Sequence, residues 1–337
     1  MKRNLARTCV LFFLVLVLDM QPAERSKDHG ERAVEIEMRC VNFRLQSDIV
    51  LEVRTLRGRL RRTKPDHPVT FDDNDSFIVE IDTAEVAMTT ASLSELLNSY
   101  VFAYPGAPIK NLRMSIDGSR LTQKGTIHKG VDLPFEIEGP VSATPDGNIR
   151  LHAEKIRSAH IPFKGLLHLF GADLSNLVNK NAGRGAKIEG DDIILSPHGI
   201  TPSPHLEGHV AQVDIKNGRI IEIFDSGRHP PSLRPPLNTE SFIYHKSGVL
   251  RFGKLIMQDA DLEIVGDGST GFFDFFLREY KKQLIAGYSK NTPANGLIVH
   301  MVDYAALASH NSATASSAGA ANRSKAASNA SRGTLNK

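Results

Sequence analysis

The sequence is poor in residues that build covalent or metal-bound scaffolds. It has two cysteines in 337 residues, Cys9 and Cys40, and a formal net charge of +3. If a leader containing Cys9 is removed, Cys40 has no disulfide partner within the chain, and a four-cysteine zinc site is excluded. A general nucleic-acid-binding protein is normally much more basic. We therefore expect no disulfide framework, no zinc module and no nucleic-acid partner.

Recognisable catalytic motifs are missing as well. There is no nucleophile elbow, phosphate loop or zinc-protease helix, and the histidines show no ligand spacing. A literal G-x-G-x-x-G occurs at 266–271, but Phe272 and Phe273 follow it and no acidic residue lies about 20 positions on. We interpret it as a glycine turn before a helix. The prediction is a protein without catalytic residues, cofactor or metal; an unrecognised hydrolase with distant paired carboxylates stays open.

The N-terminus predicts export. Lys2, Arg3 and Arg7 precede an apolar run at 9–18, which suits a signal peptide and is shorter than the roughly 20 residues of a membrane span. We expect residues 1–23 to be a signal peptide or, if uncut, an N-terminal anchor. The expected location is the periplasm or cell envelope.

The other end differs in composition. Residues 305–337 are rich in Ala, Ser and Asn and have few large apolar side chains, so we expect a disordered tail. The region between, 31–304, is predicted to be one β-rich domain, with an extended Pro-rich connection near 229–236.

Period-two alternation dominates this region. Leu112, Met114 and Ile116 alternate with polar residues, and tight-turn signals such as Asp117-Gly118 separate similar runs. The clearest hairpin surrounds Asn217-Gly218, with Val213 and Ile215 before it and Ile221 and Ile223 after it. Cys40 shares parity with Ile36 and Met38, which predicts that it packs inward. Short connections favour an antiparallel sheet.

Three segments have helical periodicity. A capping box at Ser92–Glu95 predicts a helix, a second is expected after Pro162, and a third over 272–285. Together with the strands they predict an α+β fold with amphipathic helices lying on the sheet.

The densest basic run lies on a predicted strand. Arg57, Arg59 and Arg61 share one face. We favour protection of a sheet edge, since charged edges block aggregation. The alternative is contact with anionic lipid headgroups, where each cation adds roughly 1 kcal/mol. Both interpretations can hold together.

The order of elements between Met88 and Phe224 resembles the bacterial lipid-binding proteins of the tubular lipid-binding (TULIP-like) class. The resemblance rests on a helix, a strand pair, further strands, a second helix and a hairpin: Leu93–Asn98, Leu112–Gly118 with Leu121–Ile127, Leu133–Phe135, Ala143–Leu151, the helix after Ile161-Pro162, Ile193–Leu195 and Val213–Gly218. It implies a long, strongly curved antiparallel β-sheet wrapped around amphipathic helices. It also implies a groove for acyl chains and no enzymatic activity.

On this resemblance, the expected function is non-enzymatic binding or carriage of a lipid or other apolar ligand. The alternative interpretation of the three arginines adds peripheral membrane contact. Alternatives are a structural or interaction protein of the cell envelope and a hydrolase. The predicted groove lining, placed by position alone, is Leu96, Leu97, Tyr100, Leu166, Leu167, Phe170 and Leu174.

Overall fold

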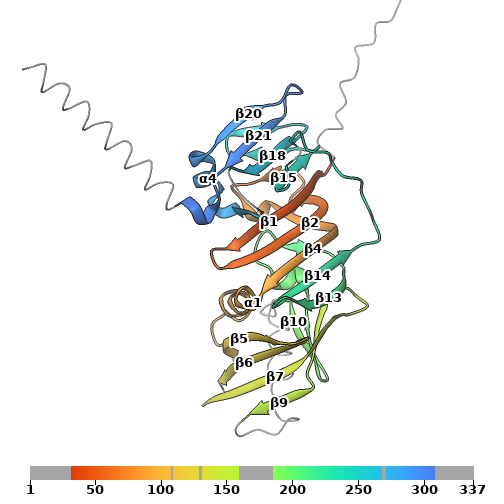
Figure 1. The fold of residues 1–337 in the computed structure, drawn as a ribbon, viewed down its shortest axis with the longest axis vertical. Helices are drawn as coiled ribbons and strands as arrows, with labels where there is room; N and C mark the ends of the chain where they lie inside the picture. The colour runs from red at the N-terminus through yellow and green to blue at the C-terminus, as the bar shows by residue number, and fades with distance from the viewer. Residues whose placement is uncertain are drawn as a thin grey trace, which may run out of the picture.

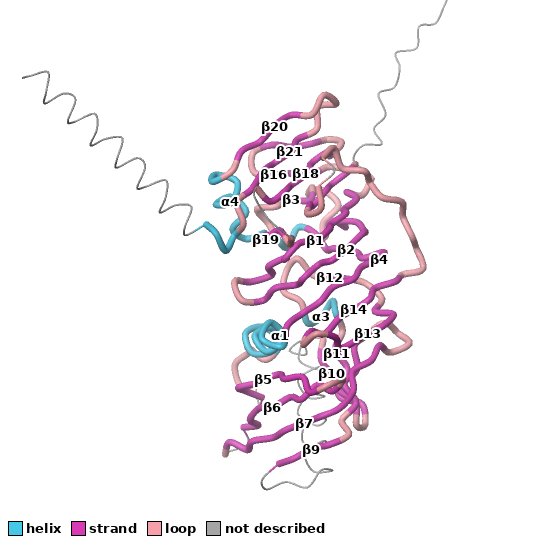
Figure 2. Tube along the Cα trace, viewed as in Figure 1, coloured by secondary structure: helices cyan, strands magenta, loops and turns pink. Residues whose placement is uncertain are grey.

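The structure is a computed structural model in which residues 32–107, 109–128, 131–158, 185–237, 239–267 and 271–307 are described. Strands make up most of these residues (Figure 2). The strands of the described part form three sheets. The molecule is elongated, with the largest sheet above helix α1 (Thr90–Leu96) and the second sheet below it in Figure 1.

The largest sheet is mostly antiparallel. Its strands are β1 (Val34–Gln46), β2 (Ile49–Arg62), β4 (Phe77–Thr89), β12 (Leu206–Glu207), β13 (Val210–Lys216), β14 (Arg219–Asp225), β15 (Phe242–Lys246), β18 (Asp261–Gly266), β19 (Phe273–Phe276), β20 (Tyr288–Asn291) and β21 (Leu297–Met301). The main path runs β13-β14-β4-β2-β1-β15-β18-β21-β20. β12 joins β4 and β19 joins β1, both in parallel.

Strand β1 changes its inward face at Cys40. Ile36 and Met38 are buried before this residue, and Val41 and Phe43 are buried after it. Cys40 has a positive φ of 48° and is itself half-buried. The strand also changes partner here, from β15 to β19. The prediction that Cys40 packs inward is wrong, because parity is kept only while the backbone stays extended.

The second sheet has seven strands among the described residues. They are β5 (Ile109–Asp117), β6 (Arg120–His128), β7 (Asp132–Ala143), β8 (Ile149–His152), β9 (Lys155–Ser158), β10 (Ala186–Glu189) and β11 (Asp192–Leu195). The path runs β10-β11-β8-β7-β6-β5. Strand β7 pairs with β6 on one side, and with β8 and then β9 on the other.

A small third sheet lies beside the upper part of the molecule. It contains β3 (Val69–Thr70), β16 (Leu250–Phe252) and β17 (Leu255–Met257), in the order β17-β16-β3. A 3-10 turn, η2 (Asn74–Ser76), follows β3 and leads into β4. Phe71 and Phe252 pack edge to face there, with ring centroids 5.3 Å apart, so this small sheet covers one end of the core.

The helices of the described residues are short. Besides α1 they are α3 (Pro197–Ile200) and α4 (Tyr280–Ala286), with a π-helical turn η3 (Leu97–Val101) and the 3-10 turns η4 (Leu277–Glu279) and η5 (Tyr304–Ala306). Helix α1 begins earlier than the predicted capping box, because Thr89 caps it by accepting the N–H of Ser92 at 3.1 Å. The predicted helix over 272–285 is wrong in its first half, which is β19.

The predicted fold class is therefore wrong. A single, strongly curved sheet wrapped around amphipathic helices is not observed. The described chain is mostly β, with separate sheets and only short helices. The physical reason is that apolar residues of both large sheets belong to one core, so the second sheet supplies much of the layer that amphipathic helices were expected to supply. The predicted helix after Pro162 lies outside the described residues.

Local hairpin predictions are confirmed. β13 and β14 pair around Asn217 and Gly218, which have φ values of 53° and 70°, as a two-residue hairpin turn requires. The β5–β6 pair is likewise antiparallel around Gly118. Most buried apolar residues, from Val34 to Met301, belong to one continuous cluster. That cluster places both large sheets around a shared core.

Candidate ligand-binding cavity

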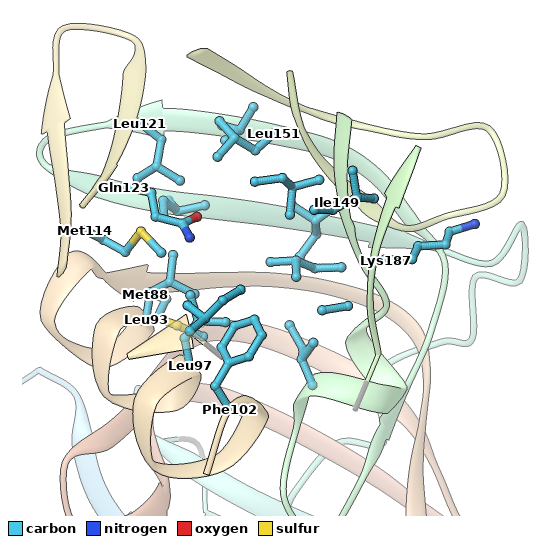
Figure 3. Close-up of a pocket in the computed structure, with 18 of the residues that line it drawn as sticks. Met88, Leu93, Leu97, Phe102, Met114, Leu121, Gln123, Ile149, Leu151 and Lys187 are labelled. Carbon is cyan, nitrogen blue, oxygen red and sulfur yellow. The ribbon is translucent and has the colours of Figure 1, made fainter. Parts of the chain in front are cut away.

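A cavity of about 60 Å³ lies between the two large sheets, beside α1 (Figure 3). Its walls come from β4, β14, α1, η3, the second sheet and α3. All but three lining residues are apolar: Met88, Leu93, Leu97, Phe102, Ile109, Met114, Leu121, Val141, Ile149, Leu151, Ala186, Ile188, Ile193, Leu195, Ile200 and Ile220. The cavity exists because the side chains of the two sheets do not pack closely enough at this point to fill the space between them.

Helix α1 and the turn η3 that follows it are fixed to the second sheet by their side chains. The hydroxyl of Ser94 accepts the N–H of Met114 at 2.8 Å. The amide of Asn98 accepts the N–H of Leu112 at 2.8 Å and donates to its carbonyl at 2.7 Å. These bonds satisfy backbone groups of β5 that face away from β6. They hold Leu93 and Leu97 against the cavity.

Two of the three polar lining residues, Gln123 and Lys187, place their polar groups on opposite sides of the cavity wall. The amide of Gln123 points into the cavity in Figure 3, and the residue is only 6% exposed. Lys187 contributes its aliphatic stem, while its Nζ points away from the cavity and lies 2.7 Å from Glu189. The ammonium group is therefore neutralised outside the apolar space.

The third polar residue is Glu222, on β14. It lies on the same face as Ile220 and Phe224, which are both buried. No hydrogen bond or ion pair joins its carboxyl group to any described residue. Burial raises its pKa to about 7. Glu222 is half-buried and is one of the residues that line the cavity.

The raised pKa predicts a specific pH dependence of stability. The native carboxyl keeps its proton up to about pH 7, whereas the unfolded one releases it near pH 4.5. The native state therefore binds more protons between these values, and the free energy of unfolding falls as pH rises through them. We expect Glu222→Gln to raise that free energy at pH 8 by up to about 3 kcal/mol and to change it little at pH 4. Urea unfolding at both pH values measures this; equal effects at both would contradict it.

The structure brings together only part of the predicted groove lining. Leu97 lines the cavity. Leu96 is fully buried and Tyr100 is half-buried against the core, and neither is among the lining residues. The other four predicted residues lie outside the described ranges: Leu166, Leu167, Phe170 and Leu174.

Sequence reasoning missed Glu222. The predicted hairpin emphasised Ile221 and Ile223, but the buried face of β14 belongs to Ile220 and Phe224. The available signal was a strand with apolar residues on both faces and one acid between them. A strand of this kind is buried on both sides, so either parity places a residue in the interior.

The arginines do not protect a sheet edge. Strand β2 lies between β1 and β4, so the edge interpretation is wrong. Each of the three pairs with carboxylates on neighbouring strands. Arg57 lies 3.3 Å from the buried Glu37. Contact with lipid headgroups stays a prediction.

The other two arginines, Arg59 and Arg61, also form ion pairs with carboxylates on nearby strands of the same sheet. Arg59 lies 3.2 Å from Glu80, and Arg61 pairs with Glu80 and with Glu207 of β12. The carboxylates that face these guanidinium groups come from β4 and β12. Positive charge on this face is thus largely matched by negative charge within the described residues.

The glycine run does not lead into a helix. Gly266 ends β18, and the chain continues after Gly271, with a φ of 96°, into strand β19. Residues 268–270 lie outside the described ranges. A dinucleotide fingerprint needs a helix whose N-terminus faces the pyrophosphate, and a strand occupies that place.

The part of the chain that the structure describes contains neither a metal-binding cluster nor a membrane-crossing helix. It contains no group of three or more histidine, cysteine or acidic side chains placed to hold a metal ion. None of its helices has the length and apolar character needed to cross a membrane. No protein-family model matches the chain, and no curated protein or solved structure is significantly similar to it.

Proposed function

We propose that this protein binds, without catalysis, a lipid or similar amphipathic molecule whose aliphatic end occupies the cavity between the two sheets. The observation that supports this is the apolar lining of that cavity, with the amide of Gln123 pointing into it (Figure 3) and Glu222 among its lining residues. Burying an aliphatic chain contributes about 0.8 kcal/mol per CH₂, so affinity needs little polar chemistry.

The size of the cavity limits what enters without rearrangement. About 60 Å³ is well below the roughly 300–1,000 Å³ of typical ligand pockets, so it admits only a short stretch of chain. Met88 and Met114 lie in the lining, and unbranched methionine side chains adjust readily to a new neighbour. A longer chain is accommodated by movement of these side chains.

Ligand content tests the proposal directly. The full chain is purified under non-denaturing conditions, extracted with organic solvent and analysed by mass spectrometry for lipids at near-stoichiometric amounts. Recovery of an aliphatic compound supports the proposal. A ligand-free protein that also fails to bind added short-chain amphiphiles would overturn it, and crosslinking to a protein partner under those conditions would favour the structural alternative.

A cavity-filling variant localises the binding. Ala186 lines the cavity on β10, and Ala186→Leu adds an isopropyl group to the free space. We expect at least a tenfold loss of bound ligand with the free energy of unfolding changed by less than about 1 kcal/mol, since the added group enters space that is already empty. Titration with a short-chain alcohol and urea unfolding measure the two effects.

The matched control is Ala153→Leu. Ala153 is 3% exposed but does not line the cavity. The same added group there overpacks the core, which costs about 1–3 kcal/mol and leaves ligand binding in place. If both variants lost stability equally and kept their ligand, the cavity would not be the binding site.

A further inference from the structure

The cavity is lined by one ionisable group, the carboxyl group of Glu222 on β14, that forms no ion pair or hydrogen bond with any described residue. Carboxyl groups inside folded proteins are normally hydrogen-bonded or paired with a cation, because burying one without a partner lowers the stability of the fold. A carboxyl group that lines a cavity and has no partner in the protein is therefore a candidate contact for a ligand.

The surroundings of Glu222 decide which ligand chemistry fits. Among the described residues that line the cavity, the only other ionisable side chain is that of Lys187 on β10, and its Nζ is bound to Glu189 away from the cavity. The remaining lining is apolar apart from the amide of Gln123. The strand partners of Glu222, Val86 on β4 and Val213 on β13, are apolar too.

We propose that Glu222 recognises a positively charged amino group at the polar end of the aliphatic ligand, which makes this protein selective for aliphatic amines over alcohols and carboxylates. This inference rests on the proposed function, since it assigns the polar end of the same ligand. A carboxylate and an ammonium group brought together out of water attract strongly and form a charge-assisted hydrogen bond. An anionic ligand in the same place would meet an uncompensated like charge.

The protonation of Glu222 makes this recognition pH-dependent. Desolvation raises the pKa of the carboxyl to about 7, and an aliphatic amine stays protonated well above that value. The ionised carboxylate is the form that binds the cation. Amine affinity therefore falls as pH decreases below 7, approaching tenfold per pH unit, while alcohol affinity stays constant.

The experiment uses the full chain and two matched probes, hexylamine and 1-hexanol, titrated calorimetrically at pH 8 and pH 5.5. We expect hexylamine to bind at least tenfold more tightly than 1-hexanol at pH 8 and to lose most of that advantage at pH 5.5. Glu222→Gln abolishes the advantage and leaves 1-hexanol binding unchanged. The control is Glu85→Gln on the adjacent strand β4, which removes the same charge from a residue paired with Arg54 outside the cavity and keeps amine selectivity.

The outcomes separate the two proposals. If neither probe binds, the proposed function fails. If both bind with equal affinity at pH 8, or if hexanoate binds more tightly than hexylamine, the cavity is a binding site but the role of Glu222 is refuted. If Glu222→Gln does not fold, the pH profile of the unsubstituted chain distinguishes the same outcomes.

Discussion

Substituting Gly139 by alanine is expected to prevent folding or to lower the free energy of unfolding by about 4 kcal/mol or more. A Cβ atom at this position would lie 1.6 Å from the carbonyl oxygen of His152, far inside any allowed contact. The segment between β8 and β9 crosses over Gly139 there, and the N–H of Glu154 donates to the carbonyl of Glu138 at 3.0 Å. Because the position of a Cβ atom is fixed by its own backbone and the carbonyl oxygen of His152 is a backbone atom, no side-chain rotation relieves the clash. Thermal and urea unfolding of the purified variant measure the loss.

The control for this prediction is Gly118→Ala. Gly118 lies in the turn between β5 and β6 with a φ of 59°, and a Cβ there meets no atom within 4 Å. The substitution adds only the strain of an alanine whose backbone is held in the left-handed region, which costs about 1 kcal/mol. A Gly139→Ala protein as stable as Gly118→Ala would show that the β8–β9 crossing is more adaptable than the structure indicates.

Substituting Asp274 by alanine is expected to lower the free energy of unfolding by about 3–5 kcal/mol. Asp274 lies on β19, is 6% exposed, and accepts two hydrogen bonds from Arg44 of β1, at 2.6 and 2.9 Å. It also accepts the N–H of Ala305 at 3.1 Å. Its removal leaves a guanidinium group with little water around it and frees the chain that follows β21. Urea unfolding at pH 7 measures the effect.

An exposed ion pair supplies the comparison. Lys282 of α4 pairs with Glu279 of η4, and the side chain of Lys282 is 66% exposed. Lys282→Ala should change the free energy of unfolding far less than Asp274→Ala does, since exposed pairs are screened by water and salt. Equal effects of Lys282→Ala and Asp274→Ala would contradict the structural role given to the buried pair.

Local structure was largely accessible from the sequence. Alternation around Leu112 and Met114, and the turn residues Asn217 and Gly218, predicted hairpins that the structure contains. These signals are short-range, because a turn and the two strands beside it are encoded within about 15 residues. Pairing between neighbours in the chain was therefore predictable.

Long-range arrangement was not accessible, for reasons visible at single residues. The positive φ of Cys40 reverses the inward parity of β1, and no pattern in the sequence marks that position. The aromatic run at Phe273–Phe276 was assigned to a helix, yet it pairs with β1 as a strand. A short apolar run has no period of its own, so its partner decides its conformation.

The candidate site combines both cases. Leu97 was predicted as a lining residue by position alone, and it does line the cavity. Glu222 was not predicted, because its position depends on which face of β14 meets the second sheet. A cavity, and the side chains that line it, result from contacts between segments that are distant in the sequence. Local sequence patterns do not specify such contacts.

The hydrogen bonds from Ser94 and Asn98 to β5 have a consequence for association between copies of the chain. An outer strand with free N–H and C=O groups is a template for intermolecular sheet growth. In β5 the groups at Leu112 and Met114 that point outward are already bonded to side chains of α1 and η3. Another chain could add a strand there only after the helix had detached. The same three bonds that shape the wall of the cavity thus also protect this border of the sheet from polymerisation.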